Sequence, residues 1–86
     1  DVNTILFFYS NQEKYKDNAE RIGGILSALK NQEEVMIYSF DYDLDSTIVD
    51  LLIKKYGVDQ GNRLVVNGRL FLDDYRNIKD VRVQLG

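Results

Sequence analysis

Apolar runs and amphipathic stripes alternate along the first two thirds of the chain. The apolar run TILFFY at residues 4–9 is typical of a strand buried on both faces, and VMIYSF at residues 35–40 predicts a second such strand. Between them, apolar residues recur three or four apart and predict an amphipathic helix over residues 11–30. That stripe consists of Tyr15, Ala19, Ile22, Ile25, Leu26 and Leu29.

Local signals support the ends of the predicted helices. Ser10 and Glu13 have the spacing of a capping box, which predicts the start of the long helix. The pair Gly23-Gly24 weakens a helix interior, so we expect that helix to lie close against a sheet. A shorter stripe formed by Ile48, Leu51, Leu52 and Tyr56 predicts a second helix. Gly57 then ends it at a C′ position.

The last third of the chain predicts a β-hairpin and a final helix. Asn67-Gly68 separates the β-prone residues 63–66 from residues 69–72, which is a strong signal for a type I′ turn. Asp73 or Asp74 can cap a last segment whose apolar residues fall three or four apart. Those apolar residues are Tyr75, Ile78, Val81 and Leu85. The alternation of residues 81–83 leaves a strand as the competing interpretation.

This order of elements predicts an α/β fold with a four-stranded mixed sheet and helices on both faces. A strand–helix–strand unit makes a right-handed parallel crossover, and the hairpin adds antiparallel strands. Residues 1–86 form a single domain, because a chain this short does not divide into two cores. The sequence begins with Asp1 and has Met36 as its only methionine, so we expect a domain taken from a longer protein or a processed product.

Composition removes several kinds of chemistry. The chain has 86 residues, a hydrophobic fraction of 44% and a charged fraction of 29%, which suit a folded globular domain. It contains no Cys, His, Pro or Trp, so disulfides, thiol catalysis and imidazole bases are excluded. The formal charge of −3 and the scattered basic residues give no footprint for nucleic acid. No apolar run is long enough to insert into a membrane, and the cellular compartment stays open.

Several short motifs, in this order, resemble the thioredoxin-like superfamily in its small, glutaredoxin-like form. FFYS at residues 7–10 is similar to the first strand entering the active-site helix, and FDYD at residues 40–43 to the acidic end of the second strand. YGV at residues 56–58 resembles the segment before the active-site proline. LVVNGR at residues 64–69 is similar to the family hairpin. The resemblance implies a βαβαββα fold.

The sequence departs from that family at both the CxxC motif and the cis-proline of its active site. Where the resemblance places the two cysteines of the CxxC motif, this chain has Glu13 and Lys16. A carboxylate and an ammonium cannot exchange disulfides, although three residues apart on a helix they attract each other weakly. The position of the cis-proline falls on Asn62, between Gly61 and Arg63. Loss of both the cysteines and the proline indicates an abandoned redox site, and we expect no cofactor.

An acidic stretch follows the second predicted strand. Asp41, Asp43 and Asp45 match the first ligand positions of an EF-hand loop and are weak candidates for a divalent metal. Ser46 and Leu52 then stand where that loop needs its glycine and its bidentate glutamate. The favoured interpretation is that these carboxylates cap a helix start and aid solubility, so no metal site is assigned.

Aromatic residues make up 12% of the chain. The four phenylalanines at positions 7, 8, 40 and 71 fall in predicted strands and are expected in the core. Tyr15, Tyr42 and Tyr75 are the better candidates for exposure. Either Tyr15 borders the surface where active relatives of the resembled family grip a peptide or glutathione, or it packs on the helix stripe. Asn62 borders that surface too.

An acidic pair offers a further comparison with glutaredoxins. Asp73-Asp74 is similar to the pair that caps their last helix and helps to hold glutathione. Here Phe71 and Leu72 replace the glycines that precede that pair, and the spacing is shorter. These departures weaken the case for glutathione binding.

The sequence therefore predicts a redox-inactive module that binds a polypeptide or supports other domains of a parent protein. The vestigial active-site surface comprises Ser10, Glu13, Tyr15, Lys16, Asn62 and Arg63. An exposed strand edge is a second place for a partner. The alternative is a cysteine-independent enzyme or a glutathione-binding domain in the same groove. Ser10, Glu13 and Tyr15 are its only candidate reactive groups, and the sequence suggests no base beside any of them.

Overall fold

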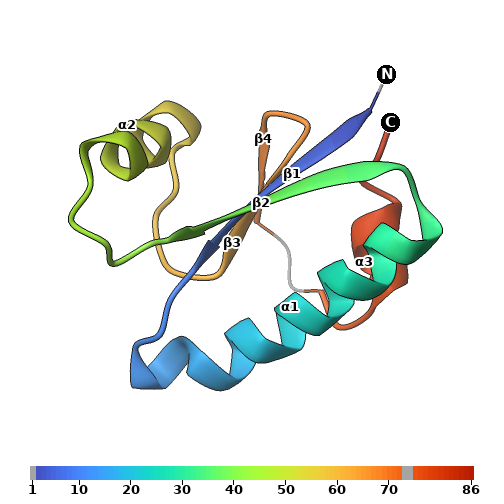
Figure 1. Cartoon of the computed structure of the whole chain (residues 1–86), viewed down its shortest axis with the longest axis horizontal. Coiled ribbons are helices and arrows are strands. Elements are labelled where there is room, and N and C mark those ends of the chain that lie inside the picture. The colour runs from blue at the N-terminus through green and yellow to red at the C-terminus, as the bar shows by residue number, and fades with distance from the viewer. Residues whose placement is uncertain (1, 73–74) are drawn as a thin grey trace.

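The computed structural model describes residues 2–72 and 75–86. Within them the chain forms four strands and three helices (Figure 1). In chain order these are β1 (Asn3–Tyr9), α1 (Glu13–Gln32), β2 (Val35–Asp41), α2 (Thr47–Tyr56), β3 (Arg63–Val66), β4 (Arg69–Phe71) and α3 (Ile78–Arg82). The order of strands and helices is the predicted one.

The strands form one mixed sheet in the order β2-β1-β3-β4. β1 pairs parallel with β2, with Ile5 opposite Ile37, and antiparallel with β3, with Phe7 opposite Leu64. β3 and β4 form the antiparallel hairpin. The mixed four-stranded sheet is therefore confirmed, and β2 and β4 are its two edges.

Two apolar clusters lie on the two faces of the sheet. α1 and α3 cover one face, where the buried residues include Ile5, Phe7, Leu64 and Val81. α2 covers part of the other face, where Phe8 and Val65 are buried together with Val58. Because side chains alternate along a strand, Phe7 and Phe8 enter different clusters.

The predicted capping box at the start of α1 is wrong. α1 begins at Glu13 with Gln12 as its N-cap, and no side chain caps it. Ser10 lies outside the helix, and its hydroxyl donates to Asp43 in the loop between β2 and α2. The end of α2 agrees with the prediction, since Gly57 has a φ of 70° and ends the helix in the left-handed conformation.

The hairpin turn and the last helix are also defined by local chemistry. Asn67 and Gly68 have φ values of 51° and 81°, as a type I′ turn requires. Asn77 caps α3 and forms a capping box with Asp80. The helix interpretation is therefore correct for Ile78–Arg82, although Asn77 performs the capping predicted for Asp73 or Asp74, which lie outside the described residues.

The glycine pair of α1 does not mark a close approach to the sheet. A Cβ atom added at Gly23 or Gly24 would meet no atom within 4 Å. The expected close packing is wrong, because the core contacts of this helix come from Ile22, Leu26 and Leu29, which flank the pair. No helix in the described part of the chain is long and apolar enough to cross a membrane.

Candidate functional site

The residues of the predicted site gather where β1 ends, α1 begins and the loop before β3 arrives. Ser10 follows β1 directly, and Asn62 directly precedes β3. The backbone N–H of Asn62 donates to the carbonyl of Phe8 at 2.7 Å, which extends the β1–β3 pairing by one bond. This bond holds the loop against the end of β1.

Asn62 joins three segments through its side chain. Its Oδ1 accepts from the backbone N–H of Ser10 at 3.1 Å, and its Nδ2 donates to the carbonyl of Tyr15 at 2.9 Å. The residue is buried, its φ is 66°, and no described residue follows a cis peptide bond. Asparagine tolerates this left-handed conformation better than most residues. Where the resembled family has a proline, this chain therefore has a hydrogen-bonded clamp between β1, α1 and β3.

Ser10 is a buried part of the same junction. Its side chain is fully buried, and its hydroxyl donates to Oδ2 of Asp43 at 2.6 Å while accepting from the N–H of Gln12 at 3.2 Å. The amide of Gln12 donates to the other oxygen of Asp43 at 2.7 Å. The expectation that Ser10 has no base beside it is wrong, because the β2–α2 loop brings Asp43 to it from 33 residues away.

The loop packs tightly at Gly61. A Cβ atom there would lie 2.6 Å from the Cβ of Ser10 and 3.1 Å from the ring of Tyr15. A contact that short does not occur between real side chains, so only glycine fits at this position. Tyr15 is half-buried in the junction, with the ammonium of Lys14 5.0 Å from its ring centre. The exposure predicted for Tyr15 is therefore only partial.

Glu13 and Lys16, which the sequence resemblance aligns with the two cysteines, lie at the surface. Both side chains are exposed, and the two do not form an ion pair with each other. The predicted attraction between them is thus solvated and contributes little. They border the clamp made by Ser10 and Asn62 but take no part in it.

Arg63 lies on the other side of Asn62 and engages the loop before it. Its guanidinium pairs with the carboxylate of Asp59 at 2.8 Å and donates to the carbonyl of Leu72 at 3.2 Å. The hydrogen bond from Arg63 lowers the pKa of Asp59 below its ordinary value, and the positive charge of Arg63 acts in the same direction. Arg63 therefore fixes the loop to the end of β4.

Tyr75 lies beneath the junction, and its predicted exposure is wrong. The residue is 7% exposed, because its ring packs against Phe71 with centroids 5.4 Å apart. Its hydroxyl donates to the carbonyl of Asn62 at 3.3 Å, and its own carbonyl accepts from Arg21 at 2.8 Å. Tyr75 is thus a structural support of the loop. The prediction that the phenylalanines lie in the core holds for Phe7, Phe8 and Phe71, while Phe40 is half-buried against the second cluster.

The space left at the junction is small. A cavity of about 70 Å³ is lined by residues that include Tyr15, Gly61, Asn62 and Tyr75. Sites for small molecules and cofactors usually enclose about 300–1,000 Å³. An open groove of about 430 Å³ lies beside it, but Arg21 in its wall already donates to Asn18 and to the carbonyl of Tyr75. Among the described residues, the space enclosed at the junction is therefore smaller than a usual small-molecule site.

The acidic stretch does not form a metal centre. Among the described residues, no group of three or more His, Cys, Asp or Glu side chains is placed to hold a metal ion. Asp41 instead accepts from the backbone N–H of Asp43 at 2.9 Å, and Asp43 binds Ser10 and Gln12. The weak candidate site at Asp41, Asp43 and Asp45 is therefore not assembled, because two of its carboxylates are used to order the loop.

No family model, curated protein or solved structure matches this chain. The fold class rests on the observed mixed α/β sheet, and the interpretation of the junction rests on its own contacts. These contacts hold the backbone in place, and the side chain of Ser10 is fully buried among them.

Proposed function

We propose that this chain is a redox-inactive thioredoxin-like domain that acts as a protein-binding or structural module. One observation carries the proposal: the position of the family proline is held by Asn62, whose side chain and backbone clamp β1, α1 and the loop together. The side-chain amide and the backbone N–H of Asn62 are bonded within the junction and are not free to contact a substrate.

The arrangement of elements supports the resemblance behind this proposal. The chain order β1-α1-β2-α2-β3-β4-α3 is the βαβαββα order that the resemblance implies, and the mixed four-stranded sheet is compatible with it. The positions of the two cysteines fall at Glu13, the first residue of α1, and at Lys16 in its first turn. Under this proposal, a former thiol site between a strand and a helix now carries a carboxylate and an ammonium.

Two surfaces are available to a polypeptide partner. One is the vestigial surface formed by the exposed side chains of Glu13 and Lys16 beside Arg63. The other is an edge of the sheet, where a strand of the partner can pair with the backbone. Neither surface requires a cofactor.

An enzyme in the same groove is the second candidate, and one contact favours it. The hydroxyl of Ser10 donates to the carboxylate of Asp43 at 2.6 Å, which is the geometry of a nucleophile beside a base. Ser10 is fully buried, however, and the adjoining cavity measures about 70 Å³. A substrate would have to open the junction before it could reach the hydroxyl, so we favour the binding module.

Selection from a displayed random-peptide library on the purified domain tests the proposal. We expect selected peptides to bind in solution with saturable heats in calorimetry and to be released chemically unchanged. An unrelated domain with the same net charge is the control, because it accounts for non-specific electrostatic binding. Failure to select any peptide that binds in solution, or chemical conversion of a bound peptide, would contradict the proposal.

A further inference from the structure

The outer edge of β2 is open along the whole strand. β2 pairs with β1 through its seven residues, and no other strand in the described part of the chain pairs with its opposite side (Figure 1). Its outward backbone N–H and C=O groups therefore lack a partner strand. Such an edge is a template for an added strand.

A groove follows this edge on the side of α1. It measures about 320 Å³ and is lined by Phe7, Gly23, Leu26, Ser27, Lys30, Ile37 and Ser39. A glycine inside a helix costs about 1 kcal/mol relative to alanine. No contact inside this chain requires Gly23, since a Cβ atom there would meet nothing within 4 Å. The groove gives a reason for glycine at position 23, because any side chain there would begin to fill the groove.

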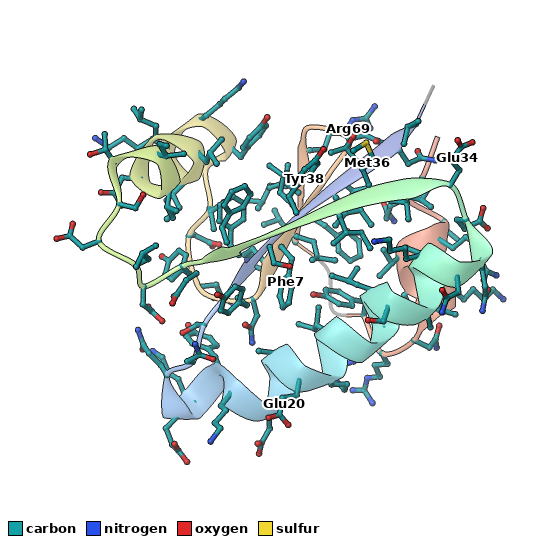
Figure 2. All side chains as sticks on the ribbon, viewed as in Figure 1. Phe7, Glu20, Glu34, Met36, Tyr38 and Arg69 are labelled. Atoms are coloured by element: carbon teal, nitrogen blue, oxygen red, sulfur yellow. The ribbon has the colours of Figure 1, made fainter. Side chains whose placement is uncertain are left out.

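The opposite face of the same strand carries exposed apolar side chains. Met36 and Tyr38 are 49% and 43% exposed, and Figure 2 shows them above the β2 ribbon, whereas Phe7 lies below it. α2 does not cover them, because its contacts lie further along the sheet around Phe8 and Phe40. A strand added to β2 would thus place alternate side chains in the groove and beside Met36 and Tyr38.

The charges near the two ends of β2 indicate which partner strand can pair with its edge. The exposed carboxylate of Glu34 precedes β2, and that of Asp45 follows it, while the carboxylate of Asp43 is bonded to Ser10 and Gln12. In an antiparallel pair with a second copy of β2, the acidic start of each strand would lie beside the acidic end of the other. Like charges at both ends disfavour that dimer, whereas basic residues at both ends of a partner strand are favoured.

We propose that the edge of β2 binds an extended segment of another polypeptide, with apolar or β-branched residues at alternate positions and Lys or Arg at both ends. This inference rests on the proposed binding function and assigns it to the β2 edge in preference to the vestigial surface. The backbone of β2 supplies the hydrogen bonds to the partner strand. The groove at Gly23 and the face with Met36 and Tyr38 select the partner's alternate side chains. The carboxylates beside β2 select basic residues at the two ends of the partner segment.

Titration of the ¹⁵N-labelled domain with the peptide Lys-Lys-Val-Thr-Val-Thr-Val-Lys-Lys tests the assignment. We expect saturable amide shifts in β2 and at Gly23 and Ser27. The same peptide with Glu in place of Lys should bind about tenfold more weakly at low salt. Gly23→Leu should weaken binding of the basic peptide about tenfold by filling the groove. Gly24→Leu is the matched control, because Gly24 is exposed and does not line the groove.

The outcomes separate this inference from the proposed function. Equal binding by the basic and acidic peptides, or equal effects of the two leucine variants, would overturn the assignment to the β2 edge. Saturable shifts confined to the surface around Glu13, Lys16 and Arg63 would overturn it too, yet they would support the proposed function. Absence of shifts with this basic peptide would also reject the assignment to the β2 edge. Peptides selected from the library that bind in solution would still support the proposed binding function.

Discussion

Asn62 is the residue on which the junction most depends. Its backbone N–H, its carbonyl and both polar atoms of its side chain are bonded, to Phe8, Tyr75, Ser10 and Tyr15. These partners belong to β1, to the segment before α3, to the end of β1 and to α1. Asn62 therefore ties residues 8–15, at the end of β1 and the start of α1, to the segment before α3.

Replacing Asn62 by the proline of the resembled family should destabilise the protein strongly. Proline cannot adopt a φ of 66°, and it lacks the N–H that donates to Phe8, so we expect Asn62→Pro to lower the free energy of unfolding by about 3 kcal/mol or more. Asn62→Gly keeps the conformation and loses only the side-chain bonds, for about 1–3 kcal/mol. Urea denaturation measures both. An equally stable proline variant would show that the loop is not clamped as described.

Asp59 gives a pH-dependent test of the same loop. Its pKa is lowered in the folded protein by the hydrogen bond from Arg63, so this bond contributes stability above the ordinary carboxyl pKa of about 3.9. The contribution is lost as the pH falls through the lowered folded value. A ¹³C NMR titration should show the Asp59 carboxyl titrating at lower pH in the native protein than in Arg63→Gln. Identical titrations would refute the bond.

Sequence reasoning located the residues of this junction but not their contacts. The resemblance pointed to Glu13, Lys16 and Asn62, and their types sufficed to exclude disulfide exchange. The hydrogen bond between Ser10 and Asp43 was missed, because a local capping pattern around Ser10 offered a competing interpretation. Side-chain bonds between residues 33 apart leave no periodic signal in a sequence.

Among the elements, α1 shows most clearly where a local argument fails. The apolar stripe correctly identified its buried face, with Ile22, Leu26 and Leu29 in the core. The pair Gly23-Gly24 was expected to press against the sheet, and instead both glycines have free space around them. Alanine is therefore expected to stabilise the protein at position 24, where helix propensity decides. It is expected to destabilise the protein at position 61, where close packing decides.

Gly24→Ala should stabilise α1, and Gly61→Ala should destabilise the loop. Alanine at position 24 meets no atom and gains helix propensity, so we expect the free energy of unfolding to rise by about 1 kcal/mol. Alanine at position 61 would place its Cβ 2.6 Å from that of Ser10, and we expect a loss of about 1–3 kcal/mol. Thermal and urea unfolding compare the variants. Destabilisation by Gly24→Ala would imply a contact that the structure lacks.

β2 shows the limit of the hydrophobic pattern for strands. The run at residues 35–40 predicted a strand buried on both faces, yet Met36 and Tyr38 are nearly half exposed. A run of apolar residues cannot distinguish a central strand from an edge, because that difference is set by the order of strands in the sheet. The exposure of this edge is what makes it a candidate binding surface.

At the scale of the whole molecule, the order of strands and helices was predictable because the hydrophobic periodicity and the turn signals indicated the same elements. The parallel β1–β2 pair follows from the crossover through α1, and the antiparallel pair follows from the Asn67-Gly68 turn. The strand order β2-β1-β3-β4 leaves β2 and β4 as edges, and the junction of Ser10 and Asn62 lies where β1 ends and β3 begins. The proposed binding function depends on which of these surfaces a partner occupies.

The central claim is that Ser10, Tyr15 and Asn62 form a closed structural junction that does not hold a small ligand such as glutathione. Titration of the ¹⁵N-labelled native domain with reduced glutathione measures this directly at the amides of Ser10, Tyr15 and Asn62. The bonds around Asn62 and the cavity of about 70 Å³ predict no saturable shifts at millimolar glutathione. Saturable shifts at these three amides would contradict the account, because they would require the clamp to open for a ligand.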